Sequence, residues 1–352
     1  MTQSSKRPPP ETDAPTADEG FRDPAMNQYF AGASDPHTTF EGKSDILSLE
    51  EIEEALRGLA HLPVVKLLSE LVRRFGLSRF QALFRRLLAP REARVIDEFG
   101  FDEKFLEPLL PIARWFHDVY FRVESDGVEH IPPSGRALIV ANHSGTLPYD
   151  ASMVVTAVML RHPARRHVRP LVEDFTYHLP YLGMFMSRVG AVRACQENAQ
   201  RLLENDQATL VFPEGVKGIG KLYSKRYRLQ RFGRGGAIRL ALATRAPIIP
   251  CSIVGAEESM PLISKVSWLA KPLGLPYIPI TPTLPWLGLL GLVPFPTKWF
   301  IDFGPPFDLS AHDPEALVHD RVLLNRLNEE LRGQVQAMID KRRAARGKRV
   351  FS

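Results

Sequence analysis

Short apolar segments alternate with amphipathic segments between Ala137 and Phe303, and this alternation constrains the fold more than any other feature. The apolar segments are predicted strands: Ala137–Asn142, Val168–Val172, Val189–Val192, Thr209–Phe212, Ile248–Val254 and Phe300–Phe303. The predicted helices between them are Ala151–Leu160, Tyr181–Ser187, Glu197–Glu204 and Gly236–Thr244. Strands that alternate with helices are typical of a parallel sheet. The sequence therefore predicts an α/β fold with a mixed, largely parallel sheet flanked by helices.

The segments before this region differ in character. Residues 1–45 are polar and proline-rich and lack the apolar core of a signal peptide, so we predict a disordered tail. Residues 46–122 begin with a capping-box pattern at Ser48–Glu51 and continue in amphipathic stretches. These patterns predict a helical N-terminal region.

The predicted α/β domain spans residues 123–340. It opens on a connector with a short strand near Val128. It closes with a helix whose apolar face carries Leu317, Leu324, Leu327, Leu331, Val335 and Met338. Residues 341–352 follow as a basic C-terminal tail.

An uncharged stretch, residues 272–297, is long enough to suggest a membrane span. It contains seven prolines, and each of them removes a helical hydrogen-bond donor. Because lipid offers no replacement partner for the freed backbone groups, we expect an apolar loop region that does not span. Its large apolar residues are Trp286, Leu289, Leu290 and Phe295. Two placements stay open, packing on the core and partial insertion into a membrane interface.

His143 and Asp150 follow the strand predicted at Ala137–Asn142. An imidazole and a carboxylate together supply a general base and the group that orients it. Gly145 and Pro148 are typical of a turn that brings the carboxylate back to the ring. There it would fix the tautomer and stabilise the imidazolium. The residues alone fit a catalytic pair and a structural histidine equally well.

The strand predicted at Thr209–Phe212 ends in Pro213-Glu214-Gly215, and a basic stretch without acidic residues follows. Its cations are Lys217, Lys221, Lys225, Arg226, Arg228, Arg231, Arg234, Arg239 and Arg245. Interleaved glycines would let backbone N–H groups join these cations around a phosphate, whereas the alternative is a solvated basic face. No Walker pattern occurs, which argues against a P-loop nucleotide site.

Composition narrows the partners and the compartment. A net charge of +5 and a pI near 9.2 favour anionic partners such as phosphate metabolites, acidic lipids or nucleic acid. The two cysteines, Cys195 and Cys251, form neither a metal-binding pattern nor a disulfide framework. We therefore expect a reducing cytosol and no metal.

Three motifs occur in order along the chain: Asn142-His143 with Asp150, Phe212-Pro213-Glu214-Gly215, and Ala246-Pro247-Ile248-Ile249-Pro250. Together they resemble the lysophospholipid (glycerolipid) acyltransferase superfamily, whose best-known bacterial members acylate 1-acylglycerol 3-phosphate. The resemblance covers roughly residues 127–309, and the F-P-E-G element is its most specific part. It implies the α/β fold of that superfamily.

The resemblance also implies roles for individual residues. His143 would be the general base and Asp150 its partner, so that an acceptor hydroxyl attacks the thioester of acyl-CoA or acyl carrier protein. Neither an acyl-enzyme nor a cofactor is implied, because the thioester is a co-substrate. Glu214 and Gly215 match the acceptor-binding motif. Lys217 stands where that motif usually has arginine and would attract phosphate as a point charge.

Two positions depart from the family pattern. Six residues separate His143 from Asp150, whereas the usual H-x-x-x-x-D spacing has four. The second motif normally has glycine followed six positions later by arginine. Counted from Gly190, that position holds Gln196, and Arg193 is the nearest cation. Arg193 is therefore a candidate phosphate ligand by proximity, and the identity of the acceptor stays open.

The resulting prediction is an O-acyltransferase of lipid metabolism and phospholipid biosynthesis. Its partners would be a lipid acceptor, such as lysophosphatidic acid or a related lysolipid, and an acyl donor. We expect a cytoplasmic enzyme held peripherally at the cytoplasmic membrane, because basic and apolar surfaces add as attractions to anionic lipid. The sequence does not predict an oligomeric state.

Three alternatives compete with this prediction. The first is an acyl-thioester or lipid hydrolase, but no G-x-S-x-G element occurs and Ser144 is poorly placed beside His143. The second is acylation of a neutral acceptor such as diacylglycerol. The third is a non-catalytic protein that binds lipid or nucleic acid through the basic stretch, where Tyr223, Tyr227 and Phe232 would stack on bases, but the α/β pattern argues against it and against nucleic acid as a partner.

Overall fold

The computed structural model describes residues 96–145, 147–178, 181–268, 270, 274–310, 320–347 and 350–351. The tail predicted at 1–45, the helices predicted at 46–95 and Leu317 lie outside the described residues. The part of the N-terminal region that is described, residues 96–122, is helical from Glu103 to Tyr120. Its elements are α5 (Glu103–Leu106), η2 (Glu107–Leu109), α6 (Leu110–Trp115) and the π-helical turn η3 (Phe116–Tyr120).

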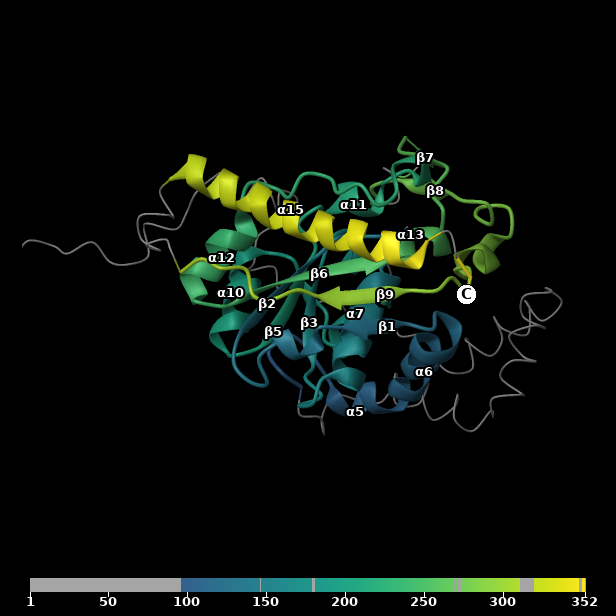
Figure 1. Cartoon of the computed structure of the whole chain (residues 1–352). Coiled ribbons are helices and arrows are strands. Elements are labelled where there is room, and N and C mark those ends of the chain that lie inside the picture. The colour runs from purple at the N-terminus through teal and green to yellow at the C-terminus, as the bar shows by residue number, and fades with distance from the viewer. Residues whose placement is uncertain are drawn as a thin grey trace, which may run out of the picture.

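A seven-stranded sheet forms the centre of the molecule, in the order β1-β9-β6-β2-β5-β3-β4 (Figure 1). The strands are β1 (Glu124–Asp126), β2 (Ala137–Ala141), β3 (Val168–Val172), β4 (Val192–Arg193), β5 (Ala208–Val211), β6 (Ile248–Val254) and β9 (Phe300–Phe303). Neighbouring strands are parallel except for β6 and β9. The predicted fold class, a mixed and largely parallel sheet flanked by helices, is confirmed.

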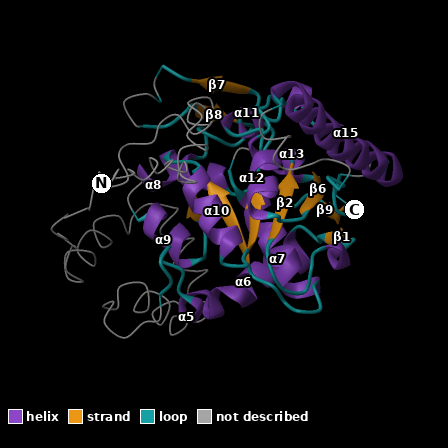
Figure 2. Cartoon of the chain, turned by 90° about the vertical axis from the view of Figure 1, so that its left-hand side faces the viewer, coloured by secondary structure: helices purple, strands orange, loops and turns teal. Residues whose placement is uncertain are grey.

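Helices cover both faces of this sheet, as Figures 1 and 2 show. The connecting and flanking elements are η4 (Val128–His130), α7 (Tyr149–Arg161), α8 (Phe175–His178), α9 (Leu182–Arg188), α10 (Gln196–Glu204), α11 (Val216–Ile219), η5 (Tyr223–Lys225), α12 (Gly236–Thr244), α13 (Ala256–Ser259) and α15 (Arg321–Arg346). Strand β2 alternates between the two cores: Leu138 and Val140 pack with residues of α10, α12 and α15, and Ile139 packs with α7. Because β2 is buried on both faces, it reads as an unbroken apolar run.

Several predicted boundaries agree with the structure, and others need correction. The strands at Val168–Val172, Ile248–Val254 and Phe300–Phe303 and the helix at Gly236–Thr244 are confirmed. The strand predicted near Val128 is wrong, because that residue begins η4 and the strand precedes it as β1. The strand predicted at Val189–Val192 is shifted, because Gly190 takes a positive φ of 96° and delays β4.

The C-terminal boundary also shifts. Helix α15 continues to Arg346 rather than ending at 340, so the first half of the predicted basic tail belongs to a packed helix. Arg342 donates to both carboxylate oxygens of Asp302 in β9, and Arg346 donates to those of Glu258. On the apolar face of α15, Ile339 is fully buried while Met338 is only partly so. These ion pairs anchor the last turns of the helix to β9 and α13.

The uncharged stretch forms a lobe beside the sheet. It contains strand β8 (Ile278–Ile280), which pairs with β7 (Ser264–Val266), and the turn η7 (Gly288–Leu292). Its later part packs against the rest of the molecule while its tip is exposed, and insertion of the tip into a membrane interface stays a prediction. Tyr149 and Tyr120 donate to the carbonyls of Leu292 and Pro294, at 2.9 and 2.6 Å.

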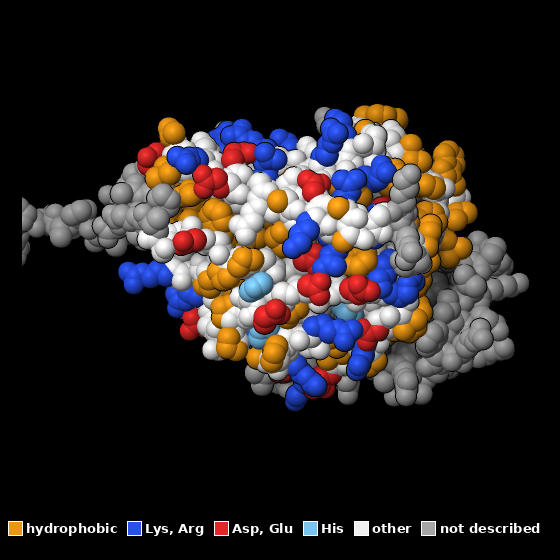
Figure 3. Space-filling model, viewed as in Figure 1, with side chains coloured by type: hydrophobic (Ala, Val, Ile, Leu, Met, Phe, Trp, Pro, Cys, Tyr) orange, Lys and Arg blue, Asp and Glu red, His pale blue; other side chains and the backbone are white. Residues whose placement is uncertain are grey.

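The exposed tip of this lobe is apolar. Trp286 is 75% exposed and Leu287 is 54% exposed. Trp268, two residues after the end of β7, is 76% exposed. Figure 3 shows the apolar side chains gathered at the end of the molecule that carries β7 and β8. Among the residues described here, no helix is long and apolar enough to cross a membrane.

Candidate active site

The C-terminal ends of β2 and β5 bring the two predicted motifs together. The two strands are parallel and pair Val140 with Val211, so the residues that follow each strand emerge side by side. The ring of His143 stacks on that of Phe212, with 4.2 Å between ring centroids and an interplanar angle of 18°. Asn142 fixes the start of the loop, because its side chain accepts from Ile253 N–H (2.7 Å) and donates to Ile253 O (3.0 Å).

His143 and Asp150 form a buried hydrogen-bonded pair. The distance from His143 Nδ1 to Asp150 Oδ2 is 2.6 Å, and Asp150 is fully buried. The backbone N–H groups of Ser144 and Ala151 donate to the same carboxylate, each at 2.8 Å. Because the carboxylate only accepts, Nδ1 carries the proton and Nε2 offers its lone pair. No residue of the described ranges makes a hydrogen bond to Nε2.

The six-residue spacing between them is accommodated by a wider turn. Gly145 takes a φ of +89°, a value that side chains disfavour, and α7 then begins at Tyr149. Asp150 thereby lies in the first turn of α7, where a carboxylate is stabilised by the helix dipole. The expectation that the turn returns Asp150 to the ring is confirmed.

Glu214 is turned into the protein and holds backbone groups. Its Oε1 accepts from His143 N–H at 3.0 Å, and its Oε2 accepts from Gln230 N–H at 2.6 Å. The side chain has no exposed area. The family resemblance implies acceptor binding for Glu214. In the structure its carboxylate connects the β2 loop to the basic stretch and so positions His143.

Two glycines are needed for this close approach. Gly215 takes a φ of +54°, and a Cβ there would lie 3.1 Å from Glu173 Oε1. A Cβ on Gly218 would lie 2.7 Å from the Cβ atoms of both His143 and Glu214. Helix α11 therefore packs its backbone directly against His143 and Glu214, which only glycine permits.

Lys221 lies buried between two carboxylates. Its Nζ is 2.9 Å from Glu257 Oε1 and 3.4 Å from Glu214 Oε2, and its side chain is 3% exposed. Burial lowers the pKa of Lys221, but Glu257 and Glu214 outweigh this effect and the net pKa is raised. Burial raises the pKa of Glu257, against the opposing effect of Lys221. This cation is thus committed to holding Glu214 rather than a ligand.

The other predicted phosphate ligands differ in their surroundings. Lys217 is exposed at the start of α11. Arg193 donates from Nε and Nη2 to the two carboxylate oxygens of Asp174, at 2.5 and 2.9 Å. Glu173, which follows β3, faces Gly215 and lies close enough to His143 for their charges to interact. Burial raises the pKa of Glu173, His143 lowers it and Asp174 raises it.

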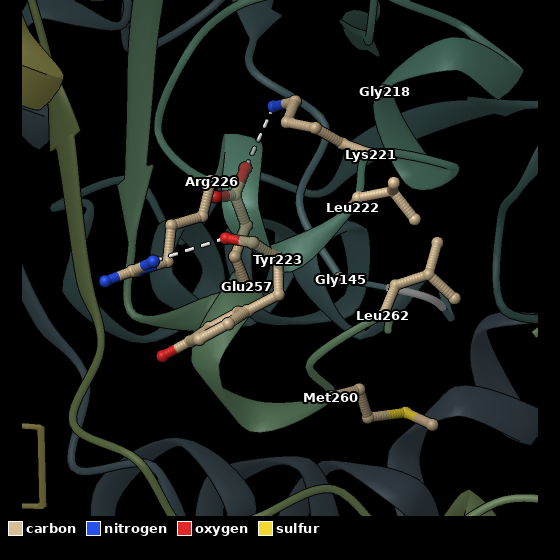
Figure 4. A pocket seen from close by; sticks show the side chains of 9 residues that line it. All are labelled: Gly145, Gly218, Lys221, Leu222, Tyr223, Arg226, Glu257, Met260 and Leu262. Carbon is tan, nitrogen blue, oxygen red and sulfur yellow. Dashed lines mark hydrogen bonds and ion pairs between the residues drawn. The ribbon is translucent and has the colours of Figure 1, made fainter. Parts of the chain in front are cut away.

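A small pocket opens beside the catalytic loops (Figure 4). Gly145 and Gly218 form its inner wall, next to His143. In Figure 4, Leu222, Met260 and Leu262 lie on one side and the Arg226 guanidinium lies on the other. The pocket therefore offers an apolar side and a cationic side within reach of the same loops.

Sequence reasoning missed Gly218, Lys221 in its buried role, Glu257 and Glu173. The G-x-x-G spacing from Gly215 to Gly218 was a usable signal, because two glycines on one turn suggest a close backbone approach. Glu257 carried no signal, since it is 36 residues from Lys221 and the two meet only through the fold. Neither cysteine lies in the site: Cys251 is fully buried in β6, and burial raises the pKa of its thiol.

Within the described ranges, no group of three or more His, Cys, Asp or Glu side chains has an arrangement that could hold a metal ion.

Comparison with known proteins identifies the family. The acyltransferase family model matches residues 122–254, which include both loops of the site. An uncharacterized protein of Mycobacterium tuberculosis is 47% identical over 245 residues, covering 68% of this chain and 67% of that protein. The chain belongs to the acyltransferase family. The family resemblance based on the motifs is confirmed.

Two more distant proteins are also similar. One is a protein of Gallus gallus named DGAT1/2-independent enzyme synthesizing storage lipids, 25% identical over 63% of this chain and 60% of that protein. The other is the crystal structure of the 1-acyl-sn-glycerophosphate acyltransferase PlsC from Thermotoga maritima. It aligns with a TM-score of 0.46 and 18% identity, over 75% of this chain and 88% of that chain.

Proposed function

We propose that this protein transfers a fatty acyl group from a thioester donor, acyl-CoA or acyl carrier protein, to a hydroxyl of a glycerolipid acceptor. The observation that carries the proposal is the 2.6 Å hydrogen bond between His143 Nδ1 and Asp150 Oδ2, with Nε2 left available. A base of this kind is what removal of a hydroxyl proton requires. Membership of the acyltransferase family supports the reaction type.

The proposed step is a direct transfer. His143 Nε2 takes the proton of the acceptor hydroxyl as its oxygen attacks the thioester carbonyl carbon. Asp150 stabilises the imidazolium that forms, and Glu214 fixes the backbone of His143. The tetrahedral intermediate then expels the thiolate, which takes the proton back from Nε2, so that ester and thiol are the products. Direct attack accounts for a site in which neither cysteine acts as nucleophile.

The acceptor is proposed as lysophosphatidic acid or a related lysolipid, and a neutral acceptor such as diacylglycerol is the second candidate. Two observations favour the neutral one: Asp174 neutralises Arg193, and the carboxyl group of Glu173 lies near His143. A negative charge beside the reacting hydroxyl would be repelled by an ionised Glu173. The name of the Gallus gallus relative, which refers to storage lipids, favours the same acceptor.

A peripheral position at the cytoplasmic membrane is also part of the proposal. The exposed Trp286 and Leu287 would enter the interface, where indole rings are favoured. Basic residues on the same molecule would add attraction to anionic lipid. Strand β7, which pairs with β8 of the lobe, begins at Ser264, shortly after Met260 and Leu262, which line the pocket. A lipid acceptor could therefore reach the site from the bilayer surface.

The test is an acyl-transfer assay on the purified full-length protein. Labelled acyl-CoA is incubated with lysophosphatidic acid, other lysolipids, monoacylglycerol and diacylglycerol, and the lipid products are identified. We expect one acceptor class to be acylated and His143→Ala to abolish the product while the circular dichroism spectrum is retained. CoA release without an acceptor would support a hydrolase instead, and full activity of His143→Ala would refute the mechanism.

A further inference from the structure

A second depression, which we call the arginine groove, lies between α15 and the segment Tyr223–Tyr227 of the basic stretch. Its volume is about 550 Å³. It is lined on one side by Tyr223, Arg226, Tyr227 and Glu258, and on the other by Asp340, Arg343, Ala344, Arg346, Gly347 and Val350. The acyl-transfer step described above uses none of these residues.

The cations of the groove are held against aromatic rings. The Arg226 guanidinium lies 4.3 Å from the centre of the Tyr223 ring, and that of Arg343 lies 4.6 Å from the Tyr227 ring. Arg346 is committed to Glu258 through two hydrogen bonds. Such stacking orients a planar guanidinium while leaving N–H donors at its edge for an anion.

Two of these arginines have donors to spare. Arg226 donates to the Tyr223 carbonyl at 3.3 Å, and Arg343 lies 3.6 Å from Asp340 in a pair that is about half exposed. Exposed pairs of this kind contribute little, so a stronger acceptor would displace Asp340. Phosphate is such an acceptor, because arginine binds it through two parallel hydrogen bonds.

The groove adjoins the small pocket beside His143. Tyr223 and Arg226 line both depressions, so these two residues lie between Gly145 and Gly218 on one side and α15 on the other. A lysolipid carries its phosphate only a few bonds from the reacting hydroxyl. The thioester of acyl-CoA, in contrast, is joined to its nucleotide phosphates by a long pantetheine arm. Gly145 and Gly218, beside His143, line the pocket but not the groove. A groove set apart from His143 in this way suits acyl-CoA better than a lysolipid.

From this geometry we propose that the arginine groove binds the phosphates of the nucleotide end of coenzyme A, with Arg226 and Arg343 as ligands. The pantetheine arm would run past Tyr223 toward the loop of His143, where the pocket, about 10 Å³ in volume, must widen to admit the thioester. This proposal rests on the proposed function, because it assumes a thioester donor. It selects acyl-CoA over acyl carrier protein as that donor.

The test compares two donors that differ only in the phosphates. With acyl-CoA, we expect Arg343→Gln and Arg226→Gln each to raise KM about tenfold, the effect of one lost charge-assisted hydrogen bond. With acyl-pantetheine, which has no nucleotide, KM should not change between wild type and variants. Arg326→Gln is the matched control, because Arg326 lies on α15 outside the groove and pairs with Glu330.

Binding of adenosine 3′,5′-bisphosphate, measured by calorimetry, separates this proposal from the proposed function. We expect saturable, salt-dependent binding to the wild type that Arg343→Gln weakens about tenfold. Binding without acyl transfer to any acceptor would leave the groove assignment intact and refute the proposed function. Acyl transfer without binding, an equal rise in KM for both donors, or a rise confined to the KM of the lipid acceptor would overturn the groove assignment.

Discussion

Gly218→Ala would place a methyl group between the backbone of α11 and the catalytic pair. The new Cβ would lie 2.7 Å from the Cβ atoms of His143 and Glu214, whereas unstrained Cβ contacts begin near 3.4 Å. Something must therefore move by roughly 0.7 Å, the difference between these two distances. Neither neighbour can give way freely, since Glu214 is held by two backbone N–H groups and His143 by Asp150.

The expected result is a large kinetic effect with a modest loss of stability. A shift of this size in a positioned base costs on the order of 10²-fold in kcat/KM. Overpacking costs about 1–3 kcal/mol of the free energy of unfolding. Acyl transfer and urea denaturation of the same preparation measure the two quantities.

Gly333→Ala is the matched control. Gly333 lies in α15, and a Cβ there meets no atom within 4 Å. The alanine should raise the free energy of unfolding by about 0.5–1 kcal/mol through helix propensity and leave kcat/KM unchanged. If Gly218→Ala keeps kcat/KM within twofold of wild type, the close packing of α11 against His143 does not control the position of the base.

Three further predictions concern single side chains. Asp150→Asn should lower kcat by about 10³–10⁴-fold without unfolding, because an amide no longer fixes the Nδ1–H tautomer; a normal pH profile with wild-type kcat would contradict this. Glu173→Gln should raise kcat/KM for a phosphate-bearing lysolipid relative to diacylglycerol, and an unchanged ratio in the paired assay would remove Glu173 from acceptor selection. Burial lowers the pKa of His167 to about 4, so the folded state binds this proton more weakly than the unfolded chain. The contribution of this group to the free energy of unfolding is fully present above the unfolded pKa near 6.5 and is lost as pH falls toward 4. At pH 5 the loss is about 2 kcal/mol. In urea denaturation at pH 7 and pH 5, His167→Leu should show a smaller difference than wild type by that amount, and an equal difference would show that His167 is not the source.

The sheet and the hydrogen-bonded pair of His143 and Asp150 were predictable because their signals are local. Strand β2 is buried on both faces, so it appears in the sequence as an unbroken apolar run, and the loop after it contains both His143 and Asp150. Strand order was not predictable, since it depends on which runs pair across the chain. Nothing in the sequence of β6 or of β9 indicates that these two strands pair antiparallel.

The role of Glu214 could not be predicted from its own motif. A carboxylate before a basic stretch suggests an exposed ligand or ion pair, whereas the fold buries it against three partners. Lys221 forms an ion pair with the buried carboxylate of Glu214, and Lys221 is itself paired with Glu257. Such a chain of contacts joins segments by tertiary packing, which short-range patterns do not encode.

Helix α15 has a consequence for the order in which the enzyme is made. Gln336 donates to Tyr227 O and accepts from Leu229 N–H, both at 2.9 Å, so the helix holds the loop that supplies Gln230 to Glu214. Synthesis proceeds from the N-terminus, and the loop of His143 leaves the ribosome well before α15 does. The base would therefore be present on the growing chain but unsupported. Acyl transfer would begin only once α15 has docked on β6, so a chain stalled before residue 321 should be inert toward lipid.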